Sequence, residues 1–222
     1  YHEALVHIPL LSVSEPKRTL VVGGGDGGVL RELVKHSSLQ EIDLVDIDKG
    51  VIDASRKYLP ELSGGAFEDP RVNVKIEDAF AFLKRVEKPY DLIVMDVTDV
   101  YEEEDGELSE RLFTNEFYSG CSAALSENGF LVSQADNHVF CPYSMVDLLS
   151  ELGNVFTKTG SFQALVPSFG GYSGYVWASK FGSVANEFPQ TKAVALHLKY
   201  LNQTTYSLAL EGGRPGGVFA SL

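Results

Sequence analysis

Short apolar runs alternate with amphipathic segments along the first half of the chain. The apolar runs predict buried strands at residues 18–23, 41–48, 71–76 and 90–96. Between them, apolar residues recur every three or four positions and predict helices at residues 26–36, 51–58 and 79–85. In the first of these helices, Val29, Leu30, Leu33 and Val34 lie on one face. This half therefore has the strand–helix order of an α/β protein.

The second half of the chain continues the alternation less regularly. It predicts helices at residues 115–125 and 143–152, strands at 129–134, 158–166 and 172–179, and a possible final strand at 206–210. Residues 97–111 form a long acidic loop between the halves, and a mixed tail begins at residue 181. Because strands that alternate with helices form parallel sheets, we expect a mostly parallel sheet with helices on both faces.

Polar residues follow five of the predicted strands. They lie at residues 23–26, 46–48, 77–79 and 96–99 and at Gln134. In open α/β sheets, ligands bind outside the carboxyl ends of the strands. We therefore expect the functional site at this edge of the sheet.

A glycine-rich turn joins the first predicted strand to the first predicted helix. Gly23, Gly25 and Gly28 satisfy G-x-G-x-x-G. The first glycine allows a tight turn, the second allows a ligand to approach the backbone, and the third allows the helix to pack closely. Asp46 ends the next strand, where a carboxylate commonly accepts hydrogen bonds from ribose hydroxyls. The pattern predicts a nucleotide site, and the alternative is a structural turn beside a solvated acid.

Asp26 lies inside this loop and discriminates between classes of nucleotide. A pyrophosphate would meet a like charge there, whereas a ligand with a cationic tail would be attracted. The loop therefore favours an S-adenosyl-type sulfonium nucleotide over NAD. Asp78, after the third strand, is suited to accept a proton from an adenine amino group or to cap the following helix, and the two roles are compatible.

Two carboxylates three residues apart, Asp96 and Asp99, follow the fourth strand. Residues on such a loop can point into one cavity. Unpaired, they would raise each other's pKa, and a cationic substrate between them would remove that penalty. The alternative interpretation is a helix cap or an Asx turn that fixes the loop.

Composition and charge restrict the classes of partner that the protein can bind. The 222 residues carry a formal net charge of −13, and a nucleic-acid partner needs a basic face, so we expect none. The acidic excess suits a cationic small substrate, or serves only solubility. No apolar run approaches the roughly 20 residues of a membrane span, and no signal segment is visible. Cys121, Cys141 and the scattered histidines predict a cytoplasmic protein without a metal site.

The order and spacing of the motifs resemble the polyamine aminopropyltransferases, the spermidine synthase family. The motifs are Tyr1-His2-Glu3, the glycine loop, Asp46-Ile47-Asp48, Asp69-Pro70-Arg71-Val72, Asp78, Asp96-x-x-Asp99, Leu112-Phe113-Thr114-x-x-Phe117-Tyr118 and Gln134. The resemblance implies a Rossmann-like seven-stranded methyltransferase fold. It also implies a small N-terminal β domain, which we expect to be missing or to lie outside these residues.

The resemblance further implies an activity and a role for each motif. The family moves an aminopropyl group from decarboxylated S-adenosylmethionine, a co-substrate rather than a cofactor, to a polyamine and releases methylthioadenosine. Asp96 would accept the proton of the attacking amine. The donor would contact Gly23, Gly25, Asp26, Asp46, Asp78 and Ala79, with Asp26 at its aminopropyl amine, Asp46 at the ribose, and Asp78 and Ala79 at the adenine. The polyamine would contact Tyr1, His2, Asp26, Asp99 and Gln134. A homodimer or homotetramer is expected.

Several positions depart from the family pattern. The family usually has Glu at 46, Gly at 79 and Pro at 100, where this chain has Asp46, Ala79 and Val100. Residues 167–172 resemble the thermospermine synthase branch, whereas the glycine loop and residues 59–72 resemble spermidine synthases. Putrescine is therefore the first candidate acceptor and spermidine the next.

We expect one catalytic domain, with an entry segment at 1–17, a Rossmann-like core at 18–180 and a C-terminal tail at 181–222. Two alternative functions stay open. An S-adenosylmethionine-dependent methyltransferase would place the carboxylate of its donor beside Asp26, and the like charge disfavours it. A non-catalytic polyamine or nucleoside binder would not need both Asp96 and Asp99.

Overall fold

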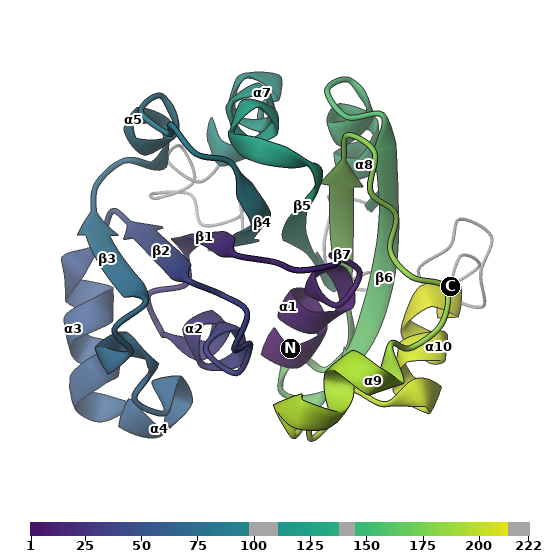
Figure 1. Ribbon diagram of the computed structural model, residues 1–222, viewed down its shortest axis with the longest axis horizontal. Helices are drawn as coiled ribbons and strands as arrows, with labels where there is room; N and C mark the ends of the chain where they lie inside the picture. Colours follow the sequence, from purple (N-terminus) through teal and green to yellow (C-terminus); the bar gives the residue numbers. More distant parts are fainter. Residues whose placement is uncertain (98–110, 138–144, 213–222) are drawn as a thin grey trace.

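The fold centres on one seven-stranded sheet. The structure, a computed structural model, describes residues 1–97, 111–137 and 145–212. The strands are β1 (Arg18–Gly23), β2 (Glu41–Asp46), β3 (Val72–Ile76), β4 (Tyr90–Asp96), β5 (Leu125–Asn137), β6 (Lys158–Val166) and β7 (Gly171–Ser179). Their order is β3-β2-β1-β4-β5-β7-β6, and β7 alone runs antiparallel to its neighbours. The mostly parallel sheet is confirmed (Figure 1).

Helices cover both faces of the sheet, as predicted (Figure 1). One face carries α1 (His2–Leu10), α2 (Gly28–Leu33), α3 (Lys49–Tyr58), α4 (Pro60–Ser63), α9 (Gln190–Ala193) and α10 (Gln203–Gly212). The other carries α5 (Ala79–Leu83), α7 (Asn115–Ala124) and α8 (Met145–Gly153). Short 3-10 turns lie at η1 (Ala66–Glu68), η2 (Arg111–Phe113), η3 (Pro167–Phe169) and η4 (Val194–Leu196). Alternate side chains of β1, β2, β4, β5 and β7 therefore enter two separate hydrophobic cores.

The C-terminal region differs from its prediction. The expected strand at residues 206–210 is wrong, because this segment belongs to helix α10. Tyr206 and Ala209, three residues apart, are both buried in the same core, and Leu208 between them is 42% exposed. That spacing is the period of a helix rather than of a strand.

Helix α1 lies within the expected entry segment and is buried along most of its length. The carboxylate of Glu3 accepts hydrogen bonds from three consecutive backbone N–H groups, those of Lys199, Tyr200 and Leu201, at 2.8–3.0 Å. At the other end of α1, Lys192 Nζ donates to the carbonyls of Leu11 and Val13. The C-terminal region thus holds the first helix at both ends.

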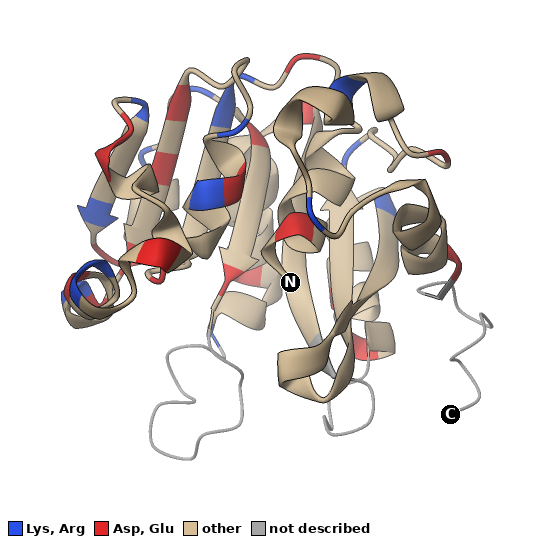
Figure 2. Cartoon of the chain, turned by 90° about the horizontal axis from the view of Figure 1, so that it is seen from below, with Lys and Arg blue, Asp and Glu red and all other residues tan. Residues whose placement is uncertain are grey.

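Acidic and basic residues are interspersed over the described part of the chain, as Figure 2 shows from one side. Within those same residues, no helix is both long enough and apolar enough to cross a membrane.

Candidate functional site

The site lies between β1 and β4, where the order in which the chain adds strands to the sheet reverses. The chain runs outward from β1 through β2 to β3 and then returns to β4 on the other side of β1. Gly23, the last residue of β1, is therefore the register partner of Asp96, the last residue of β4. Such a switch point opens a crevice at the carboxyl ends of the strands.

A cavity of about 540 Å³ occupies this crevice. It is lined by Val22, Gly23, Gly24, Gly25, Asp26, Val45, Asp46, Ile47, Asp48, Val51, Glu77, Asp78, Ala79, Phe80, Asp96, Val97, Arg111 and Leu112. All six residues predicted to contact the donor are among them, together with the predicted proton acceptor. The volume suits a nucleoside-sized ligand.

The glycine loop brings Asp26 next to the end of β4. Gly23 has φ +75°, a conformation that glycine adopts readily, and an added Cβ there would lie 2.4 Å from the Asp96 carbonyl oxygen. The next amide, of Gly24, donates to that carbonyl at 2.7 Å. The loop is therefore anchored directly to β4, and its first glycine has the tight-turn role that the sequence predicted.

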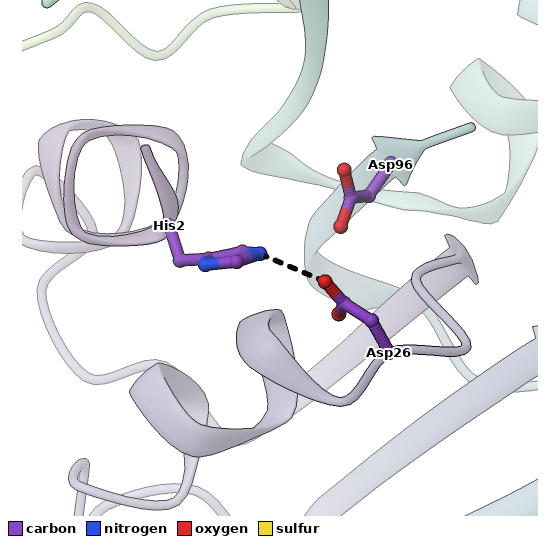
Figure 3. Close-up of side chains that lie close together, drawn as sticks. All are labelled: His2, Asp26 and Asp96. Atoms are coloured by element: carbon purple, nitrogen blue, oxygen red, sulfur yellow. Dashed lines mark ion pairs between the residues drawn. The ribbon is translucent and has the colours of Figure 1, made fainter. Parts of the chain in front are cut away.

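Three ionisable side chains from three elements meet at this point. His2 begins α1, Asp26 precedes α2 and Asp96 ends β4, and one ligand atom of each lies within 4.8 Å of the other two. His2 Nε2 and Asp26 Oδ2 are 3.4 Å apart. Figure 3 shows the three side chains pointing toward one another. One imidazole and two carboxylates form a set that suits a metal ion or an organic ammonium group, and the sequence favours the ammonium.

Asp26 is held in its charged form. Burial alone would raise its pKa, but the hydrogen bond with His2 and the one from the Gly28 N–H, at 2.7 Å, outweigh burial and lower the pKa. The carboxylate is therefore ionised throughout the neutral range and presents a fixed negative charge to the cavity.

Asp96 has the opposite electrostatic environment. Its Oδ1 accepts a hydrogen bond from the Tyr1 hydroxyl at 2.7 Å. Burial raises the pKa of Asp96, and this effect outweighs the opposing influence of His2 and Tyr1, while the negative charges of Asp26 and Asp46 raise the pKa further. Two carboxylates that share one site but have pKa values shifted in opposite directions are suited to different roles, one as a fixed charge and one as a proton acceptor.

The third glycine of the loop makes room for a side chain of α1. A Cβ added at Gly28 would lie 2.3 Å from His2 Cε1. The imidazole of His2 therefore packs directly on the first turn of α2. The sequence predicted close packing at this position but not that the neighbour would be His2.

We expect Gly28→Ala to displace the His2 ring from Asp26 while the fold is retained, because the ring can rotate away from the new methyl group. The melting temperature should change by only about 2–4 °C, equivalent to about 1 kcal/mol at this chain size. The NMR chemical shift of His2 Cε1–H measures the displacement. Gly153→Ala is the control, because its added Cβ meets nothing within 4 Å. An unchanged His2 shift in Gly28→Ala would contradict this packing.

The far end of the cavity contains the residues predicted for ribose and adenine. Asp46 Oδ1 accepts from the Asp48 N–H at 2.8 Å, and burial raises the pKa of Asp46. Asp78 caps α5, with its Oδ1 accepting from the Phe80 N–H at 2.9 Å. The capping role of Asp78 is confirmed, and its position on the cavity wall leaves the adenine role a prediction.

Of the described residues predicted for the polyamine, Asp26 lines the cavity, whereas Tyr1, His2 and Gln134 are not among its lining residues. Tyr1 and His2 contact Asp96 and Asp26, as described above. Gln134, near the end of β5, donates from Nε2 to the Val97 carbonyl at 3.0 Å. Asp99 and most of the acidic loop lie outside the described residues. The structure thus brings together all the described members of the predicted site, in two groups joined by Asp26 and Asp96.

An aromatic cluster next to Tyr1 was not predicted. The Tyr1 ring lies 5.5 Å from that of Phe169 and 5.6 Å from that of Tyr175, and Tyr175 stacks on Phe162 at 4.9 Å. The Tyr175 hydroxyl donates to the Tyr1 carbonyl at 3.5 Å. The aromatic content of the two last strands was visible in the sequence, but its contact with residue 1 depends on where α1 packs.

Comparisons with known proteins agree with this geometry. A family model described as "Spermine/spermidine synthase domain" matches residues 1–188. The polyamine aminopropyltransferase of Pectobacterium carotovorum is 39% identical over 180 residues, which are 81% of this chain and 61% of the relative. That of Bacillus subtilis is 39% identical over 183 residues, 82% of this chain and 63% of the relative. The chain thus spans about three-fifths of the length of these relatives.

Two solved structures share the fold. A spermidine synthase in complex with the transition-state analogue AdoDATO matches with a TM-score of 0.83 and 32% identity, covering 95% of this chain and 71% of its own. The spermidine synthase of Thermotoga maritima matches with a TM-score of 0.79 and 30% identity, over 95% and 70%. These likenesses confirm the Rossmann-like seven-stranded fold. On its sequence motifs, its fold and its match over residues 1–188, the chain belongs to the spermine/spermidine synthase family.

Proposed function

We propose that this protein transfers the aminopropyl group of decarboxylated S-adenosylmethionine to a polyamine amine and releases methylthioadenosine. The observation that carries the proposal is one cavity in which a fixed carboxylate, Asp26, and a proton-accepting carboxylate, Asp96, lie side by side. A donor with a cationic tail and an acceptor that must lose a proton need this combination. Relatives named polyamine aminopropyltransferase support it.

The donor occupies the cavity in this proposal. Its ribose meets Asp46, its adenine meets Asp78 and Ala79, and its sulfonium end runs along the loop from Gly23 to Gly25. The terminal ammonium of the aminopropyl group pairs with Asp26. An S-adenosylmethionine donor would instead bring a carboxylate close to Asp26, and like charges repel.

The polyamine enters from the side of Tyr1, His2 and Gln134. Its reactive nitrogen lies against Asp96, and putrescine is the first candidate acceptor, with spermidine next. Asp99 belongs to this group as a prediction from the sequence. A homodimer or homotetramer, a cytoplasmic location and the lack of a cofactor also stay predictions.

The reaction is a displacement at carbon. The nitrogen lone pair forms a bond to the aminopropyl carbon, and the electrons of the breaking C–S bond return to sulfur, which leaves as a neutral thioether. The ammonium proton goes to Asp96. An amine pKa of about 10.4 and an ordinary Asp pKa of about 3.9 make full proton transfer cost roughly 9 kcal/mol. Burial of Asp96 narrows this gap, and alignment of the three reacting atoms supplies much of the rate.

The acid limb of the pH profile should report Asp96. The carboxylate must be ionised to accept the proton, and its pKa is raised by burial. Activity is therefore expected to fall, as pH decreases, at a higher pH than an ordinary carboxyl pKa of about 3.9 would give. The measurement is kcat/KM for the amine against pH. His2→Gln is the control, because disappearance of the limb in that variant would assign it to the histidine instead.

A direct assay tests the proposed function. The protein is incubated with decarboxylated S-adenosylmethionine and, in separate reactions, with putrescine, spermidine or cadaverine. We expect methylthioadenosine and a product heavier than the acceptor by one aminopropyl group. Absence of methylthioadenosine with every acceptor would reject aminopropyl transfer. Turnover with S-adenosylmethionine in place of the decarboxylated donor would indicate a methyltransferase.

A further inference from the structure

A chain of buried polar side chains joins α1 to α2. His7 on α1 is fully buried, and Glu32 on α2 is 1% exposed. His7 Nε2 lies 2.9 Å from Glu32 Oε2, and His7 Nδ1 lies 2.9 Å from Nε2 of His36. Two cations also contact the same carboxylate, Lys35 Nζ at 2.6 Å and Arg31 Nε at 2.8 Å. Every step of this chain is within hydrogen-bond distance.

The electrostatics of the cluster fix the direction of each hydrogen bond. Burial would raise the pKa of Glu32, but its bonds with His7, Lys35 and Arg31 outweigh burial, so Glu32 is a carboxylate that only accepts. Burial lowers the pKa of His7 and brings that of His36 to about 3, so both rings are neutral at pH 7. A neutral His7 that donates to Glu32 through Nε2 must accept from His36 through Nδ1.

Stability alone does not explain such a cluster. Buried ion pairs contribute little net stability relative to apolar residues of similar volume. Their directional bonds do fix the rotation of one helix against another and its position along its axis. Glu3, held by the backbone of residues 199–201, fixes α1 from another side. The polar contacts of α1 are therefore suited to setting its position precisely.

The position of α1 against α2 determines the geometry of the site. Tyr1 and His2, at the start of α1, reach Asp96 and Asp26. Asp26 directly precedes α2, which begins at Gly28. A shift of α1 along α2 therefore changes the distances from Tyr1 and His2 to both carboxylates.

We propose that the buried His7–Glu32–His36 chain is a positioning device that places Tyr1 and His2 for the polyamine acceptor. This inference rests on the proposed function of the site. No residue of α1 lines the donor cavity, and Asp26 keeps its hydrogen bond from the Gly28 N–H when α1 moves, so the main effect falls on the acceptor.

His7→Leu tests the proposal, because it removes both hydrogen bonds of His7 while an apolar side chain still fills the buried space. With decarboxylated S-adenosylmethionine saturating, we expect the KM for putrescine to rise about tenfold, as a loss of about 1.4 kcal/mol in acceptor binding would give. The KM for the donor should change by less than about twofold. His7→Gln, which retains a donor and an acceptor, should restore most of the acceptor KM.

Ile8→Val is the matched control. Ile8 is also fully buried on α1, and the substitution loosens its packing without removing a polar contact. It should lower the melting temperature with both KM values unchanged. If His7→Leu fails to fold, Glu32→Gln carries the same test, since it removes the charge that Arg31 and Lys35 bind, and we expect the same selective rise.

The outcomes separate this inference from the proposed function. The positioning role would be overturned if the wild-type protein is active and His7→Leu, or its substitute Glu32→Gln, changes both KM values equally or changes neither. A wild-type protein without aminopropyl transfer to any acceptor would instead reject the function on which the role depends.

Discussion

Asp96→Asn is expected to reduce kcat by about 10²- to 10⁴-fold, the range for loss of a general base. The amide keeps the size of the carboxyl group and still accepts the hydrogen bond of the Tyr1 hydroxyl, but it cannot take up the proton of the amine. Binding of methylthioadenosine, measured by calorimetry, should change by less than about threefold. A loss concentrated in kcat would show that Asp96 acts in the chemical step rather than in holding the donor.

The stability of this variant separates a chemical defect from a folding defect. Burial raises the pKa of Asp96, so the folded protein disfavours the charged form relative to the unfolded chain. At neutral pH, where the unfolded carboxyl group is ionised, this difference destabilises the fold, and Asp96→Asn should keep or raise the melting temperature. A lowered melting temperature together with lost binding would contradict the assigned role.

Asp78→Asn is the matched control in the same cavity. Asn caps helices as well as Asp, so α5 should be unaffected. We expect its effect on the KM for the donor and not on kcat. An equal fall of kcat in the two variants would show that loss of charge in the cavity, rather than loss of the base, is responsible.

Asp26→Asn is expected to raise the KM for the decarboxylated donor by about 10- to 100-fold. A hydrogen bond to a charged group contributes about 1.5–3 kcal/mol, and each 1.4 kcal/mol is a factor of ten. The same change should strengthen inhibition by S-adenosylmethionine, because the like charge that repels its carboxylate is gone. Opposite effects on two ligands that differ by one carboxylate are difficult to obtain from general damage to the site.

Asp48→Asn provides the comparison for Asp26. Asp48 lines the same cavity and caps α3 through the N–H groups of Gly50 and Val51. Its substitution should leave the KM for the donor within about twofold. If neither ligand responds to Asp26→Asn, the terminal ammonium is bound elsewhere.

Strands β1 and β4 could be predicted closely from the sequence because they are buried along most of their length. The predicted strands at 18–23 and 90–96 have the observed bounds of β1 and β4. Continuous apolar runs that end in polar residues are clear signals for such strands. The predicted helix at 26–36 is shorter in the structure, where α2 spans Gly28–Leu33, since the glycine loop takes up its first residues.

Two helices lacked a clear pattern. Helix α1 is buried on nearly all sides, so its sequence lacks the polar face of an amphipathic helix. It also contains Pro9, a residue that disfavours the interior of a helix. Residues 206–210 form a short, mostly apolar run, Tyr-Ser-Leu-Ala-Leu, and periodicity alone does not distinguish such a run from a buried strand. The packing of α10 on β6 decides its structure, and that contact has no local signal.

The donor side of the site was predictable for a similar reason. Its residues follow strand ends, and one topological rule places all strand ends at the same edge of the sheet. The aromatic cluster of Tyr1, Phe169 and Tyr175 and the buried His7–Glu32 contact depend on packing between segments far apart in the sequence. Nothing near these residues in the chain indicates their partners.

The hold of residues 199–201 on Glu3 has a consequence for biosynthesis. The donor cavity is lined by residues between Val22 and Leu112, so its components have all been synthesised when the ribosome has made about half of this chain. Glu3, by contrast, meets partners 196 to 198 residues later. Because distant contacts form slowly and after local ones, the contact of Glu3 with residues 199–201 forms after the contacts of α1 with α2. A nascent chain therefore contains every residue of the nucleotide pocket well before it contains the last partners of Glu3 on the amine side.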